Sequence, residues 1–137
     1  MDALINKALD AVWNEMCAPN RQYRTPDNQV GAEFSVAESD ANSVLIQTGG
    51  GNPLRINKQA FFAALKYLDE NQHGPKRRLR IDSDTNPEKA GPLCLETRRA
   101  NNGGKDGPRV ITYIAPMLTE TGLVQVDGNR PNRVWLA

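Results

Sequence analysis

The chain has 137 residues, of which 39% are hydrophobic and 24% charged, a composition that suits one globular domain and excludes general disorder. No apolar run approaches the roughly 20 residues of a membrane span, and no basic segment leads the N-terminus as in a signal peptide. The two cysteines, Cys17 and Cys94, provide neither a disulfide framework nor a metal-ligand spacing. We therefore expect a soluble cytoplasmic protein with free thiols, no metal and no cofactor.

The formal net charge of +1 is unevenly distributed along the chain. Residues 1–70 hold six Lys and Arg against nine Asp and Glu, whereas residues 71–137 hold eleven against seven. Because binding to a polyanion depends on local rather than total charge, the asymmetry places any nucleic-acid contact in the C-terminal half. An ordinary solvated basic surface would give the same counts.

The first helix is predicted over residues 2–17, where apolar side chains recur at helical spacing and form one stripe. The stripe consists of Leu4, Ile5, Ala8, Leu9, Val12, Trp13, Met16 and Cys17. Two interpretations stay open. The stripe packs on the core of its own domain, or it pairs with a second copy in a homodimer.

A β-hairpin is expected after a polar, proline-containing loop over residues 18–31. Its strands are the β-prone runs Glu33–Ala37 and Ser43–Thr48. The glycines that follow, Gly49-Gly50-Gly51, lack the Gly-Lys-Ser/Thr ending of a phosphate-binding loop, so they predict a flexible turn.

A central helix is predicted from a cap at Asn57 to about Gln72. Its core face carries Phe61, Leu65 and Leu68, with Phe62 and Ala64 beside them. The basic run Lys76-Arg77-Arg78-Leu79-Arg80 then predicts a strand or loop with a positive outer side. The run is equally consistent with a basic binding surface and with a basic surface that only contacts water.

Two further helices are expected in the C-terminal half. The first covers residues 92–101, with Leu93, Cys94 and Thr97 inward and Glu96, Arg98 and Arg99 outward. A loop over residues 102–107 leads to the second, predicted over residues 108–121 with Pro116 as a kink or a delayed start. Its buried side carries Val110, Ile111, Ile114, Met117 and Leu118, and Gly122 suits the position after its end.

The end of the chain combines this helix with a predicted hairpin. The string from Leu118 to Val124 contains Gly122-Leu123, and the strands Leu123–Val126 and Arg133–Leu136 enclose a polar turn over residues 127–132. Over roughly residues 87–137 the pattern resembles a winged helix-turn-helix DNA-binding domain. The resemblance implies an α+β, winged-helix-like body over residues 30–137 of a single domain, extended by the N-terminal helix and the first hairpin, with Leu123, Val124 and Trp135 anchoring the wing to the core.

The resemblance also implies a set of DNA contacts. The helix from Pro108 would contact bases in the major groove through Arg109, Thr112 and Tyr113. Contacts near phosphates would come from Arg98, Arg99, Asn102 and Lys105, with Asn101 nearby, and the wing would contribute Arg130 and Arg133. Each has a structural alternative: Arg109 as a solvated helix-start residue, Tyr113 as a core residue, and Arg130 as a partner of Asp127 that stiffens the turn.

Enzyme activity is not expected from this sequence. The lone His73 has no companion motif for a catalytic triad, and Asp82, Asp84 and Glu88 lie in a turn-rich segment without the strand-borne Glu-x-Lys of a magnesium nuclease. We therefore expect a non-catalytic protein that binds double-stranded DNA and acts in transcription regulation or as a targeting module. The alternative is a protein-binding adaptor or small phage-type inhibitor that docks on a larger restriction, repair or defence assembly.

Overall fold

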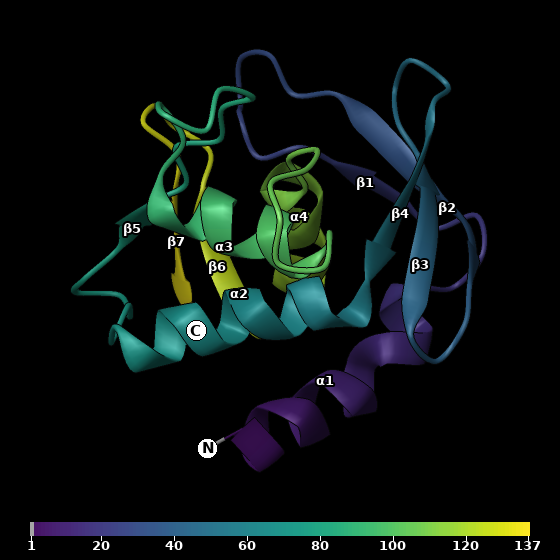
Figure 1. Cartoon of the computed structure of the whole chain (residues 1–137), viewed down its shortest axis with the longest axis horizontal. Coiled ribbons are helices and arrows are strands. Elements are labelled where there is room, and N and C mark those ends of the chain that lie inside the picture. Colours follow the sequence, from purple (N-terminus) through teal and green to yellow (C-terminus); the bar gives the residue numbers. More distant parts are fainter. Residues whose placement is uncertain (1) are drawn as a thin grey trace.

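The computed structural model describes residues 2–137 and has an α+β fold built from two antiparallel sheets and four helices (Figure 1). In chain order the elements are α1 (Asp2–Met16), β1 (Gln22–Arg24), β2 (Glu33–Ser39), β3 (Ser43–Gln47), β4 (Pro53–Asn57), α2 (Lys58–Glu70), β5 (Leu79–Arg80), α3 (Pro92–Ala100), α4 (Ile111–Glu120), β6 (Val124–Asp127) and β7 (Arg133–Leu136). Strands β1–β4 form one sheet in sequential order, and the other has the order β5-β7-β6. Figure 1 shows α4 between the two sheets, with α2 and then α1 below it.

The four-stranded sheet contains the predicted hairpin as β2 and β3, which pair antiparallel. It is wider than expected, because β1 pairs with β2 and β4 pairs with β3. Alternation along the strands directs Phe34, Val36, Ile46 and Ile56 into the core. The prediction of a loop throughout residues 18–31 is therefore wrong at Gln22–Arg24, a three-residue strand with only one apolar side chain to reveal it.

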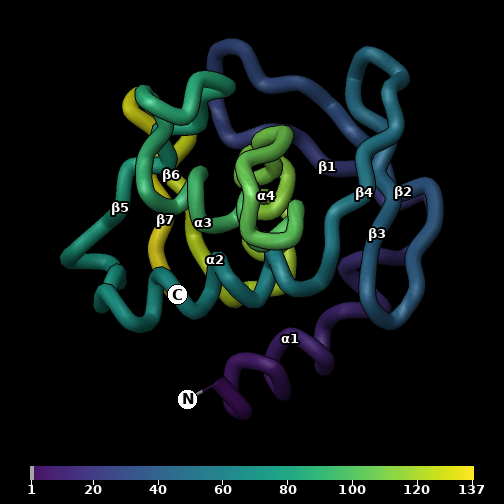
Figure 2. Tube along the Cα trace, in the orientation of Figure 1, coloured from purple at the N-terminus to yellow at the C-terminus, as the bar shows by residue number. Residues whose placement is uncertain are grey.

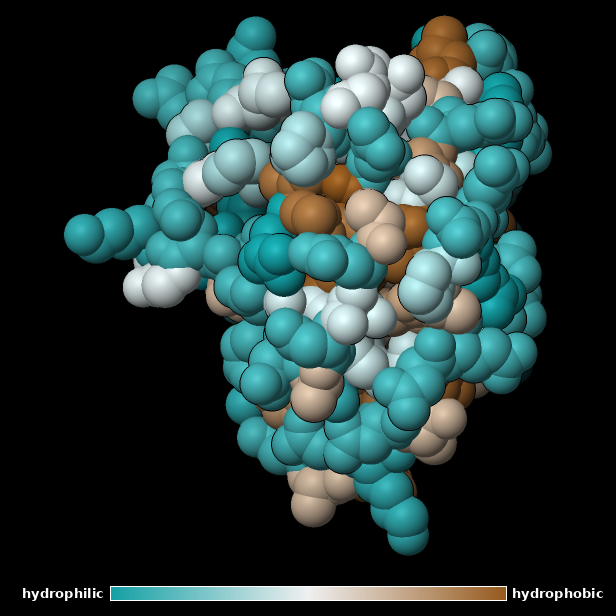
Figure 3. All heavy atoms as spheres, turned by 90° about the vertical axis from the view of Figure 1, so that its right-hand side faces the viewer, coloured by the Kyte–Doolittle hydropathy of each residue, from teal (hydrophilic) through white to brown (hydrophobic). Residues whose placement is uncertain are grey.

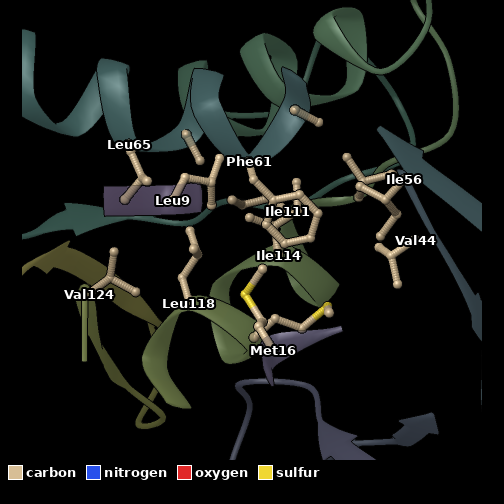
Figure 4. Packing of buried hydrophobic residues seen from close by; sticks show 14 of the residues in the cluster. Leu9, Met16, Val44, Ile56, Phe61, Leu65, Ile111, Ile114, Leu118 and Val124 are labelled. Carbon is tan, nitrogen blue, oxygen red and sulfur yellow. The ribbon is translucent and has the colours of Figure 1, made fainter. Parts of the chain in front are cut away.

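Helix α1 packs on the core of its own domain, as the first of the two interpretations expected. Leu9 is fully buried, and the ring of Trp13 stands edge-on to Phe61 of α2 with 5.1 Å between ring centroids. Figure 4 shows Leu9 and Met16 within the cluster that Phe61 joins from α2 and Ile114 from α4. Leu4, at the exposed edge of the stripe, keeps 64% of its surface accessible.

Helix α2 begins where predicted, but Asn57 does not cap it with its side chain. The Asn57 side-chain amide instead donates to the Asn101 carbonyl at 3.4 Å, and the Asn57 backbone N–H donates to Oδ1 of Asn101 at 2.6 Å. Asn57 therefore joins the start of α2 to the end of α3. Asparagine before a helix suggests a cap, but the residue type alone does not show a partner that lies 44 positions away.

The C-terminal elements follow the prediction with two corrections. Helix α4 starts at Ile111 rather than Pro108 and contains Pro116, while Gly122 has φ +81°, a left-handed conformation that suits glycine after a helix end. Strands β6 and β7 form the predicted hairpin, and β5 adds a third strand to it. Of the three residues expected to anchor the wing, Val124 belongs to the core cluster and Leu123 packs against it, whereas Trp135 is buried outside that cluster.

The surface formed by the four-stranded sheet, at the right of Figure 1, is mostly hydrophilic (Figure 3). An apolar patch interrupts it in the upper part of that view. Arg55 of β4 forms an ion pair with Glu38 of β2 across β3, with 3.6 Å between the closest atoms. Among the described residues, no helix is long and apolar enough to cross a membrane.

Candidate nucleic-acid interface

Four of the nine predicted DNA-contacting residues line one cleft of about 480 Å³. Arg109 precedes α4, Thr112 and Tyr113 lie in its first turn, and Arg130 comes from the turn between β6 and β7. The remaining walls are formed by the loop after β1, the segment after β5 and the β6–β7 turn. Residues far apart in the sequence therefore meet at the N-terminal end of α4.

The β1–β2 loop is bound to the β6–β7 turn. Two nitrogens of the Arg130 guanidinium bind Oδ2 of Asp27: Nε lies 2.9 Å from it and Nη2 2.8 Å. The Asn28 backbone N–H donates to the Gly128 carbonyl at 3.0 Å, and its side-chain amide donates to Asn129. Figure 2 shows this loop arching across the top of the view toward the β6–β7 turn. The hypothesis that Arg130 stiffens the turn is thus right in kind, but its partner is Asp27 rather than Asp127.

Hydrogen bonds hold the Asp27 carboxylate in its charged form. The Gln29 backbone N–H donates to Oδ1 at 3.0 Å, and Arg130 binds Oδ2. Together they hold the pKa of Asp27 below its ordinary value, with the Gln29 hydrogen bond as the largest cause. The contact between the loop and the turn is therefore an ion pair at neutral pH.

Helix α4 presents only part of its surface to solvent. Ile111, Ile114 and Leu118 are buried, and Tyr113 packs edge-on against Phe34 of β2 with 5.0 Å between ring centroids. Strand β1 contacts the same helix. At its N-terminal end the exposed Arg109 and the half-buried Thr112 reach the surface. The core alternative for Tyr113 is thus partly correct, because its ring packs against the hydrophobic cluster.

Arg98 does not point outward, which corrects its assignment to the DNA surface. Its side chain is 3% exposed. Its guanidinium donates to the carbonyls of Asp84 at 2.6 Å, Thr85 at 2.8 Å and Gly107 at 3.0 Å, and it pairs with Asp106 at 2.8 Å. Arg98 therefore joins α3 to the loops on both sides of it. Its charge favoured an outward position, but helical spacing from Cys94 places Arg98 inward, where the loops supply the acceptors that a buried arginine needs.

The other predicted phosphate contacts lie outside the cleft. Arg99 and Lys105 are exposed, whereas Asn102 uses its side-chain amide to donate to the Asp106 carbonyl at 2.7 Å. Arg133 is half-buried on β7, directly opposite Arg80 of β5. The structure thus gathers Arg109, Thr112, Tyr113 and Arg130, and distributes the remaining five elsewhere.

The groups weighed for catalysis show no convergent arrangement among residues 2–137. His73 is buried, with Nδ1 2.9 Å from the Arg77 carbonyl, and it stacks on Tyr67. Asp82 pairs with Arg80 at 3.1 Å. Within the described chain, no three His, Cys, Asp or Glu side chains come together as a metal site.

Comparison with known proteins gives no relative from which function can be transferred. No family model matches the sequence, and no curated protein and no solved structure is significantly similar to it. Function must therefore be inferred from this chain's own residues. Sequence reasoning missed Asp27 and Asn28, because a contact across about 100 positions leaves no local signal.

Proposed function

We propose that this protein binds double-stranded DNA without catalysing a reaction, as a regulatory or targeting module. The observation that carries the proposal is the cleft at the start of α4, where Arg109 and Arg130 converge with Thr112 and Tyr113. The order helix α3, helix α4 and hairpin β6–β7 supports it, since this order resembles a winged helix-turn-helix. In helix-turn-helix proteins the N-terminal residues of the second helix contact base edges.

The N-terminal end of α4 carries the exposed Arg109, and this is the end that contacts bases in helix-turn-helix proteins. Arg109 makes no hydrogen bond or ion pair with another side chain in the described residues, and arginine binds guanine or phosphate through two parallel hydrogen bonds. Strand β1 contacts α4, and its Tyr23 and Arg24 line one pocket with Pro116 of that helix, so the helix would meet the groove end-on rather than along its length. The connection from α3 to α4 spans residues 101–110, longer than the tight turn of the family, and Arg98 fixes it to α3.

Arg130 is available to DNA although it is paired. Its side chain is 52% exposed, and Asp27 occupies Nε and Nη2. A guanidinium carries five N–H donors, so Nη1 is left for a phosphate at the rim of the cleft. Arg130 therefore suits a phosphate contact on the wing, which would position the protein without reading sequence.

A second candidate is a protein-docking module, as in an adaptor or a small phage-type inhibitor. The observation that favours it is the cover over α4, because Phe34 and β1 occupy a surface that a long groove contact would use. The net charge of +1 also suits a protein partner. The two candidates differ in salt dependence, since release of counterions from DNA makes affinity fall steeply with salt.

The test is a binding measurement with Arg109→Ala, Arg130→Ala and the control Lys7→Ala, on the exposed side of α1. We expect Arg130→Ala to weaken binding to all duplexes alike and Arg109→Ala to weaken binding to the preferred sequence most, by about 1–3 kcal/mol. Lys7→Ala should bind as the parent does. Parent-like binding by the Arg109→Ala, Arg130→Ala double variant would show that the cleft is not the DNA site, whereas a parent that binds no duplex at low salt would favour the protein-docking candidate.

A further inference from the structure

The small sheet has an outer face that carries arginines. Val134 of β7 is buried, so its neighbours Arg133 and Trp135 lie on the opposite face of the strand. Val134 pairs with Leu79 of β5, which places Arg78 and Arg80 on that same opposite face. We call Arg78, Arg80, Arg133 and Trp135 the outer sheet face. It lies at the left of Figure 1, where β5 and β7 are neighbours.

The outer sheet face holds more positive charge than its own carboxylates neutralise. Arg80 and Arg133 are directly opposite each other across β5 and β7, and like charges in such a pair repel. Asp82 pairs with Arg80. Asp127 of β6 lies opposite Arg133 of β7, and its Oδ1 accepts a hydrogen bond from the Asn129 N–H. The exposed Lys76 and Arg77 precede β5 and add to the excess.

Contacts within the face hold Arg78 in place. Its guanidinium carbon lies 4.0 Å from the centre of the Trp135 ring, and its Nε donates to the Pro75 carbonyl at 3.1 Å. A cation over an aromatic ring is attracted by the electron-rich face of the ring. This stacking explains why Trp135 is buried although it lies outside the core cluster. Arg78 is thus held beside Trp135 and Arg80 beside Asp82, and together with Arg133 they form an array of cations.

The array reaches the rim of the cleft at the start of α4. Asp82, which pairs with Arg80, also lines that cleft. We propose that the outer sheet face binds the phosphodiester backbone beside the DNA segment that the cleft contacts. This inference rests on the proposed function, and it adds Arg78 and Arg80 to Arg133, which the resemblance had already assigned to the wing. Paired arginines match a phosphate geometrically, and a phosphate between Arg80 and Arg133 would remove their repulsion.

The experiment uses the full chain and a labelled duplex of random sequence, with the dissociation constant measured by fluorescence anisotropy over a series of NaCl concentrations. The variants are Arg80→Gln, Arg133→Gln and the double variant, checked for folding by circular dichroism. Arg55→Gln in β4 is the matched control, since it removes the same charge from an exposed position on the other sheet. Arg77→Gln serves as a further variant should Arg133→Gln unfold.

We expect each single variant to lower the slope of log affinity against log salt by about one, and the double variant by about two. Arg55→Gln should keep the parent's slope. A parent that binds DNA in a salt-dependent way while the double variant keeps its slope would overturn the assignment of this face and leave the proposed function standing. A parent that binds no duplex at low salt would overturn both.

Discussion

Replacing Arg98 by methionine tests the correction that the structure makes to the sequence-based site. The substitution keeps a long side chain and removes every donor of the guanidinium. Three backbone carbonyls, those of Asp84, Thr85 and Gly107, then lose a charged partner, and Asp106 loses its ion pair. If Arg98 is structural, stability falls; if it is a surface contact to DNA, stability is unchanged.

The expected loss follows from the number and burial of these contacts. A hydrogen bond to a charged group contributes about 1.5–3 kcal/mol, and removing one partner of a buried ion pair typically costs about 3–5 kcal/mol. The contacts share one guanidinium and are not additive, so we expect a loss of about 3–5 kcal/mol in the free energy of unfolding. For a domain of this size that corresponds to a fall in Tm of about 10–20 °C.

The assay is urea denaturation of the parent and the variant, followed by circular dichroism. Arg99→Met is the matched control, because the neighbouring arginine is exposed and should change stability by no more than about 0.5 kcal/mol. Arg98→Lys, which keeps the charge but not the fork of donors, should lie between the parent and Arg98→Met. A loss below about 1 kcal/mol for Arg98→Met would refute the structural role.

Three further predictions concern the other contacts that hold the fold together. Leu9→Ala should lower the free energy of unfolding by about 2–5 kcal/mol, whereas Leu4→Ala should leave it and the mass in solution unchanged. Parent-like stability of Leu9→Ala, or a changed mass for Leu4→Ala, would contradict a helix docked only on its own core. Burial raises the pKa of Cys17 to about 12, with Lys58 opposing the shift. This thiol should therefore resist a thiol reagent at pH 8 until urea unfolds the chain. Rapid labelling of Cys17 in the native protein would contradict its burial. Because the pKa of Asp27 is lowered, its hold on the β6–β7 turn is present above about pH 4 and is lost as the pH falls through the folded-state pKa. Hydrogen exchange at the Asn28 amide should therefore be faster in Asp27→Asn than in the parent at pH 7, and equal rates would show that the ion pair does not hold the loop.

The elements with strong periodicity were predictable from the sequence. Each of these elements buries one of its sides, and the spacing of its apolar residues therefore indicates its type. This holds for the stripe of α1, the core face of α2 and the alternation in β2, β3 and the wing. Gly122 was predictable for a similar reason, because a left-handed residue after a helix favours glycine. These elements carry the α+β architecture.

What the sequence did not reveal depends on contacts between distant residues. Arg98 has the polarity of a surface residue, and only the two loops folded around it make an inward position stable. The pair of Asp27 and Arg130 joins residues 103 positions apart, so neither flank indicates it. Strands as short as β1 and β5 have too few residues to show a period, although the basic run at Arg78 and Arg80 marked the segment that forms the outer sheet face.

The most direct test of DNA binding is the affinity of the unmodified chain for a duplex as salt is raised from about 50 to 200 mM. If the cleft and the outer sheet face bind DNA as proposed, they contact several phosphates, and each neutralised phosphate contributes about −0.9 to the slope of log affinity against log salt. We predict measurable binding at the lower concentration, with a slope of about −3 to −5 for contacts from Arg78, Arg80, Arg109, Arg130 and Arg133. A slope near zero, or no binding to duplex DNA at the lower salt, would contradict the account.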